Sequence, residues 1–195
     1  MIRPKDNPFA AHRIDKLAYR FRDDSLADMK ERLKQSSYRG AIVGPYGSGK
    51  TTLLEALSRD FKNNGYDVRC IFVNSDQRNF SWAQLGYVCR NCSVKTMVFI
   101  DGADWLPRWQ WMLIKHFSKK GGGLIIACHR RDYLPVIKEC TTSSAVLQDC
   151  LEELTGQTDG HLQQAGRILF KKHSGNIRNV FRELYFLAGQ GEKKL

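Results

Sequence analysis

No run of apolar residues in the sequence approaches the roughly 20 residues that a membrane-spanning helix needs. Residues 1–8, MIRPKDNP, also contain no apolar stretch of the signal-peptide type. We therefore expect no membrane span, and we expect the chain in the cytoplasm. Hydrophobic residues make up 42% of the 195 positions, which excludes a disordered or fibrous protein and allows one sizeable core.

The sequence contains one CxxC motif, Cys89–Cys92, and no second pair. A zinc site needs such a second pair at a suitable distance, and a redox dithiol needs the start of a helix in a thioredoxin-like unit. We therefore expect all six cysteines to be free thiols. Cys70 and Cys128 lie within apolar runs, so both are predicted to be small hydrophobic residues of buried strands.

There is no basic run of five residues, although the formal net charge is +11 and the pI is near 9.5. A balance of this sign can serve nucleic acid, an anionic membrane surface or an acidic partner, or it can simply solvate the surface. Nucleic acid is therefore one candidate partner and a protein is the other. The cluster to test consists of Lys171, Lys172, Arg178 and Arg182.

The most informative stretch matches the pattern G-x-x-x-x-G-K-[ST] of the Walker A phosphate loop. An apolar strand-type run, residues 39–43, precedes this stretch, and a helical pattern over residues 52–61 follows it. A match to this pattern indicates a phosphate-binding site when a strand precedes the glycine loop and a helix follows it, as is predicted here. The residues of the candidate loop are Gly44, Pro45, Tyr46, Gly47, Ser48, Gly49, Lys50, Thr51 and Thr52.

Each residue type in this loop has a chemical task. The glycines let the backbone bend until successive N–H groups converge on an anion, and the helix N-terminus adds partial positive charge. Lys50 is expected to reach the β- and γ-phosphates, and the Thr51 hydroxyl to complete the shell of a Mg²⁺ ion. ATP and Mg²⁺ are therefore the expected cofactors.

A second motif matches the Walker B pattern, in which an apolar strand ends on an aspartate. Met97–Asp101 reads Met-Val-Phe-Ile-Asp, and the motif predicts that Asp101 enters the Mg²⁺ shell beside Thr51. The alternative is a buried strand whose terminal aspartate is only solvated.

Strand and helix patterns alternate along the chain, which predicts a parallel sheet covered by helices on both faces, an α/β fold. The four clearest strands cover residues 39–43, 67–73, 95–101 and 121–128. A short helix is expected at 132–139, a fifth strand at 143–147, and two C-terminal helices at 159–173 and 176–187. The expected domains are an N-terminal arm and helix (1–38), a nucleotide-binding core (39–157) and a helical lid-like extension (158–195).

One strand and one helix separate Lys50 from Asp101, which resembles the additional-strand, catalytic-glutamate division of P-loop NTPases. The AAA+, RecA-like and ABC families belong to that division, and the terminal helices make this chain similar to AAA+ proteins. The absence of an LSGGQ sequence between the Walker motifs argues against an ABC ATPase. The resemblance implies a three-layer sandwich whose five-stranded, mainly parallel sheet has the order 5-1-4-3-2.

The resemblance also implies catalytic positions. A glutamate base usually follows the Walker B aspartate, but here Gly102 follows Asp101, so Asp104 is the next candidate base. A surface or helix-capping role is the alternative for Asp104. His129 matches sensor 1, a γ-phosphate contact, and Arg178 matches sensor 2, although each can instead be structural.

The expected function is that of a Mg²⁺-dependent, AAA+-like ATPase whose nucleotide state controls a partner. A small-molecule or nucleotide kinase is one alternative, with Arg130 and Arg131 holding a second phosphate. A weakly hydrolysing switch or adaptor is another. In a homo-oligomer one of these arginines can act as a finger toward the neighbouring subunit. Phe9 or Tyr19 is a candidate adenine contact, with core packing as the alternative.

Overall fold

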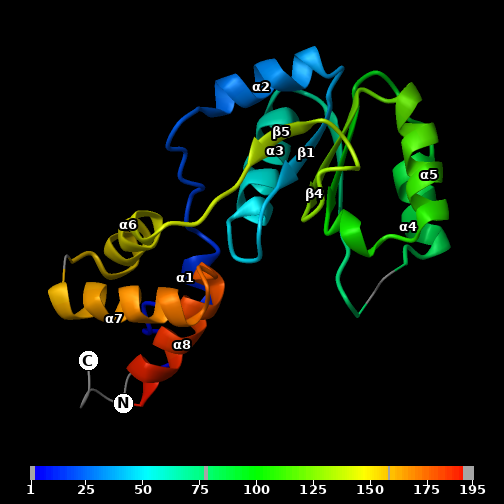
Figure 1. Cartoon of the computed structure of the whole chain (residues 1–195). Coiled ribbons are helices and arrows are strands. Elements are labelled where there is room, and N and C mark those ends of the chain that lie inside the picture. The colour runs from blue at the N-terminus through cyan, green and yellow to red at the C-terminus, as the bar shows by residue number, and fades with distance from the viewer. Residues whose placement is uncertain (1–2, 77–78, 158, 191–195) are drawn as a thin grey trace. The chain divides into compact units, whose positions relative to one another are not determined.

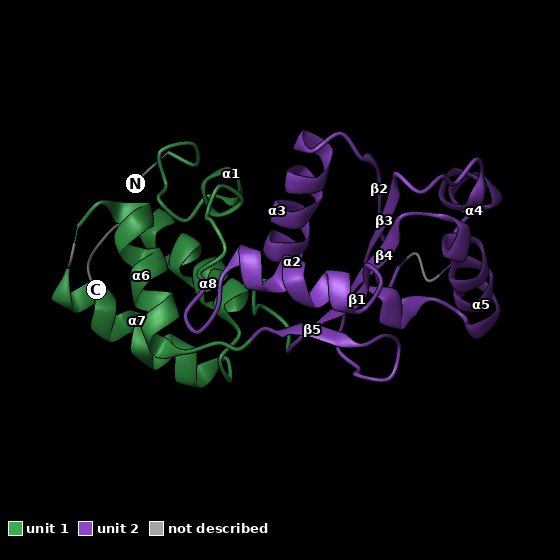
Figure 2. Cartoon of the chain, turned by 90° about the horizontal axis from the view of Figure 1, so that it is seen from above, with its two compact units in different colours: residues 1–20, 45–49, 141–195 green, residues 21–44, 50–140 purple. Residues whose placement is uncertain are grey.

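The computed structural model describes residues 3–76, 79–157 and 159–190. Figure 2 shows two compact units, each made of separate chain segments. Unit 1 comprises residues 1–20, 45–49 and 141–195, and unit 2 comprises residues 21–44 and 50–140. The domain boundaries expected from the sequence remain a prediction.

A five-stranded parallel sheet forms the centre of unit 2, with the order β2-β3-β4-β1-β5. This order is the predicted one read from the opposite edge. Val43 pairs with Cys128 and Asp101 pairs with Ala127, so β1, β3 and β4 end at the same edge of the sheet. The strands are β1 (Arg39–Val43), β2 (Asp67–Phe72), β3 (Thr96–Asp101), β4 (Gly123–Cys128) and β5 (Val136–Glu139).

Helices cover both faces of this sheet (Figure 1). One face packs on α3, where the Phe61 ring lies 6.0 Å from the ring of Phe99. The other face packs on α4 and α5, and Val98 and Ile100 share a buried cluster with Ile114 there. The helices of unit 2 are α2 (Leu26–Gln35), α3 (Lys50–Asn63), α4 (Trp82–Cys89) and α5 (Arg108–Phe117), with the short turns η1 (Ala103–Trp105) and η2 (Ser118–Lys120).

Helix starts in unit 2 follow the sequence signals. The Ser25 side chain accepts a hydrogen bond from the N–H of Asp28, whose carboxylate accepts one from the N–H of Ser25. Ser81 and Gln84 form the same reciprocal cap at the start of α4. Such a capping box satisfies two backbone donors that a helix start leaves unpaired. The two caps therefore fix where α2 and α4 begin.

The prediction for residues 132–147 is wrong. Residues 132–139 contain the strand β5 instead of a helix, because Val136–Glu139 pairs with β1. The residues predicted as a strand at 143–147 begin α6 (Ser144–Thr155), and the Ser143 hydroxyl caps this helix by accepting from the N–H of Val146. Cys70 is exposed because β2 is an edge strand, whereas Cys128 is buried as predicted.

Unit 1 is helical in its described part. Its core contains the Phe9 ring, stacked at 6.4 Å on the ring of Phe181, so core packing accounts for Phe9. Asn7 ties this arm to α8, because its side chain accepts from the Phe9 N–H and donates to the Tyr185 carbonyl. None of the described helices in either unit is long and apolar enough to cross a membrane. The helices of unit 1 are α1 (Ala11–Ile14), α6, α7 (Gly160–Lys172) and α8 (Ile177–Gly189), and the last two confirm the predicted C-terminal helices.

Candidate nucleotide-binding site

The predicted phosphate loop follows directly from β1, and α3 begins at Lys50. Gly47 and Gly49 have φ angles of +75° and +83°, a left-handed conformation that glycine adopts without steric cost. The Ser48 hydroxyl donates to the carbonyl of Pro45 at 2.8 Å and closes the turn. Strand, glycine turn and helix therefore occur in the arrangement that the motif predicts.

Lys50 is the cation of this loop, and only 9% of its surface is exposed. Its Nζ donates to the carbonyl of Gly44 at 2.9 Å. Burial lowers the pKa of Lys50, while the nearby carboxylates of Asp101 and Asp104 favour the charged form. The ammonium is therefore confined beside the end of β1 and has carboxylates in its surroundings.

Thr51 and Asp101 meet as the two motifs predict. The Thr51 hydroxyl donates to Oδ2 of Asp101 at 2.6 Å, which joins the first turn of α3 to the end of β3. A hydroxyl and a carboxylate are hard oxygen ligands, and Mg²⁺ in nucleotide sites is usually held by one or two carboxylates together with substrate phosphates. This pair of side chains therefore fits a Mg²⁺ site.

Gly102 occupies the position where the resemblance leads one to expect glutamate, and its backbone explains the difference. Its φ is +76°, and a Cβ atom added there would lie 2.1 Å from the carbonyl oxygen of Val73. The Gly102 N–H donates to the carbonyl of Ala127 at 3.0 Å, so the residue is fixed to β4. A side chain at this position would require displacement of the backbone after β2.

Asp104 lies one turn further on, in η1. Its Oδ2 accepts a hydrogen bond from the N–H of His129 at 2.6 Å, and its Oδ1 accepts one from the N–H of Arg130 at 3.3 Å. The carboxylate therefore ties η1 to the chain that leaves β4. Its role as a general base remains a prediction.

His129 follows β4 at the same edge of the sheet as Lys50. Burial and the charge of Lys50 lower the pKa of His129, against the opposing effects of Asp104 and a hydrogen bond with the Gly44 backbone. These effects favour a neutral imidazole near neutral pH. Gly44, Lys50, Thr51, Asp101, Asp104 and His129 are therefore brought together within unit 2.

In unit 1 the turn Pro45–Gly49 lies against residues from both ends of the chain. A Cβ atom at Gly47 would lie 2.2 Å from Oδ1 of Asn176, the residue that caps α8. A Cβ atom at Gly49 would lie 3.1 Å from the ring of Tyr19. The φ angles favour glycine at both positions, and at Gly47 the close approach of Asn176 also leaves no room for a side chain.

Among the remaining predicted residues, Tyr46 is 60% exposed in the loop and Thr52 lies in the first turn of α3. Arg178 is exposed in the first turn of α8, the helix whose N-terminus meets Gly47. Sequence reasoning missed Asn176 as part of the site. The available signal was an asparagine directly before an amphipathic helix, which is the usual position of an N-cap.

No protein-family model and no curated protein matches this chain. Solved structures do match: a DnaA replication initiator bound to AMPPCP and single-stranded DNA has a TM-score of 0.59 at 16% identity, over 90% of this chain and 64% of that one. A DNA replication initiation factor has a TM-score of 0.57 at 16% identity, over 84% and 59% of the two chains. Two RuvB mutants from Thermotoga maritima reach 0.50 at 11% identity, over 84% and 69%.

The fold is that of an AAA+-type P-loop NTPase. The similarity in sequence is low, so the likeness concerns the fold, and this chain spans 64% and 59% of the DnaA and initiation-factor chains. The all-parallel sheet with helices on both faces confirms the α/β prediction and the resemblance to AAA+ proteins.

Two arginines follow His129 in this AAA+-type fold, and both have acidic partners in their own chain. Arg130 pairs with Asp132, and Arg131 pairs with Glu139. These partners lie on the solvent side, where an ion pair contributes little to stability. A phosphate contact by Arg130 or Arg131 remains a prediction.

None of the six cysteines, all of which lie among the described residues, takes part in a disulfide bond. Burial raises the pKa of the Cys128 thiol to about 12, and this thiol donates to the carbonyl of Arg130 at 3.1 Å. Cys89 and Cys92 form no cluster with other ligand types, since the described residues contain no group of three or more His, Cys, Asp or Glu side chains that could hold a metal ion.

Proposed function

We propose that this chain binds ATP with Mg²⁺, hydrolyses it, and uses its nucleotide state to control a partner. The observation that carries the proposal is the 2.6 Å hydrogen bond between Thr51 and Asp101, next to the buried cation of Lys50. Bound Mg²⁺ would neutralise charge on the β- and γ-phosphates. Thr51 and Asp101 would hold the ion, and Lys50 would bind the same phosphates from the α3 side.

The other residues at this edge would act on the attacking water and the γ-phosphate. Asp104 would accept the proton of the water, and the neutral ring of His129 would contact the γ-phosphate. In unit 1, Arg178 lies in the helix turn next to the phosphate loop and would reach the phosphates as a sensor. Each of these roles rests on position and chemistry.

A weakly hydrolysing switch is the second candidate function, and a specific contact favours it. Both oxygens of Asp104 already accept backbone hydrogen bonds from His129 and Arg130, and position 102 carries no carboxylate. Backbone donors that already occupy both oxygens leave fewer lone pairs free to orient an attacking water. Slow turnover with tight binding would then let the nucleotide act as a signal.

The partner belongs to the proposal as well. The similar DnaA structure contains single-stranded DNA in addition to AMPPCP, and nucleic acid fits the net charge of +11 on this chain. A protein is the alternative partner, and assembly with further copies of the chain is a third component of the proposal.

The test is a turnover assay on the full chain. Phosphate and ADP are measured with ATP and Mg²⁺, with and without EDTA, and then with DNA, RNA and candidate phosphate acceptors. Equal release of phosphate and ADP supports an ATPase, and ADP formed without phosphate in the presence of an acceptor supports the kinase alternative. ATP binding with very slow release supports the switch. If calorimetry detects no ATP binding in the presence of Mg²⁺, the proposal is wrong.

A further inference from the structure

The helices α4 and α5 together with η2, which we call the α4–α5 layer, contain no acidic residue. In the sequence no Asp or Glu occurs between Asp76 and Asp101, or between Asp104 and Asp132. Basic residues are nevertheless frequent there and are exposed. They are Arg90, Lys95, Arg108, Lys115, Lys119 and Lys120. The elements of this layer therefore carry basic residues without acidic ones, in contrast to α7 and α8, where Lys172 pairs with Glu183. One carboxylate lies beside the layer, that of Asp67 on β2, and it pairs with Arg69.

The same layer exposes large aromatic side chains. Trp82 on α4 is 79% exposed and Trp109 on α5 is 48% exposed, and their ring centroids lie 6.0 Å apart at 45°. Tyr87 and Met112 are also more than half exposed, at 51% and 69%. Contiguous exposed apolar patches mark contacts with a ligand or partner, and the two neighbouring indole rings form such a patch. Both helices lie on the same face of the sheet (Figure 1).

Hydrogen bonds fix α4 to α5 at one end and to the strand β2 at the other. Gln110, which is 1% exposed, donates to the carbonyl of Phe80 at 2.9 Å and accepts from its N–H at 2.8 Å. At the other end of α4, the guanidinium of Arg69 donates to the carbonyls of Tyr87 and Arg90. The indole rings are thus presented by a preorganised pair of helices, which lowers the entropic cost of binding.

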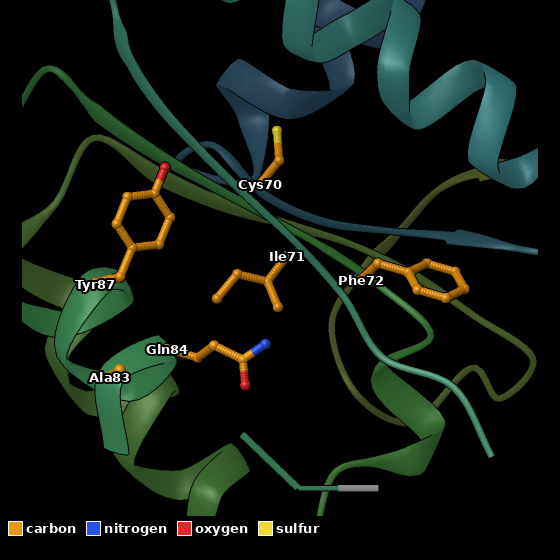
Figure 3. Close-up of a pocket in the computed structure, with 6 residues that line it drawn as sticks. All are labelled: Cys70, Ile71, Phe72, Ala83, Gln84 and Tyr87. Atoms are coloured by element: carbon orange, nitrogen blue, oxygen red, sulfur yellow. The ribbon is translucent and has the colours of Figure 1, made fainter. Parts of the chain in front are cut away.

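A pocket of about 380 Å³ adjoins the aromatic residues, between the edge strand β2 and α4. Figure 3 shows Ile71 of β2 facing Gln84 and Tyr87 of α4 across this space. Ala83, the neighbour of Trp82, also lines the pocket. The pocket therefore has the phenol ring of Tyr87 at its side, and this ring comes from the same helix as Trp82.

We propose that the α4–α5 layer binds single-stranded nucleic acid, with bases stacked on Trp82 and Trp109 and phosphates held by the surrounding cations. Exposed aromatic rings combined with basic residues are the physical requirement for such binding, because every base has a π-face and every linkage has a negative charge. A duplex fits the layer less well, because its bases are already stacked inside the double helix. An apolar protein surface also fits less well, because it brings no negative charge to the exposed cations. The proposal uses no residue of the nucleotide site.

The experiment measures fluorescence anisotropy of labelled oligo(dT) and oligo(U), and of a duplex, at about 50 mM salt without nucleotide. We expect both single strands to bind more tightly than the duplex. Trp82→Ala and Trp109→Ala should each weaken single-strand binding about tenfold, the loss of one stacked base. Arg108→Gln and Lys115→Gln should each lower the slope of log affinity against log salt by about 0.7.

Matched controls come from unit 1. Phe186→Ala removes a 54% exposed aromatic ring from α8, and Lys171→Gln removes an exposed cation from α7; neither should change binding. Because the assay contains no nucleotide, a failed nucleotide site does not affect this result. The proposal is overturned if neither single strand binds, if the duplex binds equally well, or if the tryptophan variants bind like wild type. Binding lost in Lys171→Gln alone would overturn it in favour of the C-terminal helices.

Discussion

Unit 2 contains two regions with opposite arrangements of charged residues. One is the edge of the sheet where β1, β3 and β4 end, and the other is the α4–α5 layer. At the edge, Lys50 is buried and lies among the Gly44 carbonyl and the carboxylates of Asp101 and Asp104. On the layer, the cations are exposed and the helices that carry them contain no acidic residue. The first arrangement suits one small anion held by directed bonds, and the second suits a long polyanion of any sequence.

This difference has energetic consequences. A buried charge is costly to leave without a partner, so removal of one member at the edge affects the rest. Exposed charges interact over a distance that salt shortens to about 8–10 Å at physiological ionic strength. We therefore expect ATP binding to depend on individual residues, and nucleic-acid binding to depend on ionic strength.

The largest expected effect is the loss of ATP affinity in Lys50→Ala. Lys50 is the cation expected over the β- and γ-phosphates, so its removal should lower ATP affinity by on the order of 100-fold or more. Thermal unfolding with and without ATP and Mg²⁺ measures the effect. If ATP protects wild type and variant equally against thermal unfolding, Lys50 is not part of the ATP site. If both bind oligo(dT) with equal affinity, the ATP site and the α4–α5 layer act independently.

The next effect concerns hydrolysis. Asp104→Asn should leave ATP binding intact and slow turnover by about 10²-fold, the usual contribution of a general base. Asp23→Asn, at an exposed position, is the matched control. Unchanged turnover in Asp104→Asn would assign this residue to holding the backbone of His129 and Arg130, and would favour the weakly hydrolysing switch.

A smaller effect on stability is expected at Gly102. Gly102→Ala should lower the free energy of unfolding by about 1–3 kcal/mol, because its φ is left-handed and the new Cβ meets the Val73 carbonyl. Gly65→Ala is the control, since Gly65 has a φ of +79° but open space around it. Chemical denaturation measures both variants. Gly102→Glu should destabilise the chain as well and should not raise turnover; a faster ATPase would contradict the steric explanation.

The smallest expected effect is a pH dependence at His129. Its pKa is lowered from 6.5 by burial and by Lys50, so in acid the unfolded chain takes up a proton before the folded chain does. The stability contributed by the neutral ring is therefore present above about pH 6.5 and is lost as the pH falls below that value. Unfolding free energies from about pH 5 to 7.5 should decline less steeply toward acid in His129→Gln. Parallel curves for the two proteins would argue against a buried neutral imidazole.

The resemblance to AAA+ proteins implied the sheet order, and the two Walker motifs predicted the meeting of Thr51 with Asp101. Sequence reasoning failed at residues 132–147 for a local reason. Val136–Glu139 is too short to show a period, and its strand conformation comes from pairing with β1. The Ser143 cap was visible in the sequence, but the short apolar run Ala145–Leu147 fits a strand as well as a helix.

Other features of the molecule depend on distant parts of the chain and could not be predicted. The need for glycine at position 102 arises from the Val73 carbonyl, which belongs to a neighbouring strand end. The exposure of Trp82 and Trp109 is equally invisible, since an aromatic helix is expected to bury such rings. Sequence patterns indicate which residues share a helix face, and only the packing decides which face meets solvent.

The contact between Gly47 and Asn176 determines what can be learned from shortened versions of this protein. The chain passes between the two units at residues 20–21, 44–45, 49–50 and 140–141, so neither unit is a continuous piece of polypeptide. A fragment ending at Cys140 would keep both Walker motifs but would lose α8, the helix against which the phosphate loop packs. A motif-based boundary would therefore yield a fragment with an unsupported loop, and a fragment that fails to bind ATP would say nothing about the intact chain.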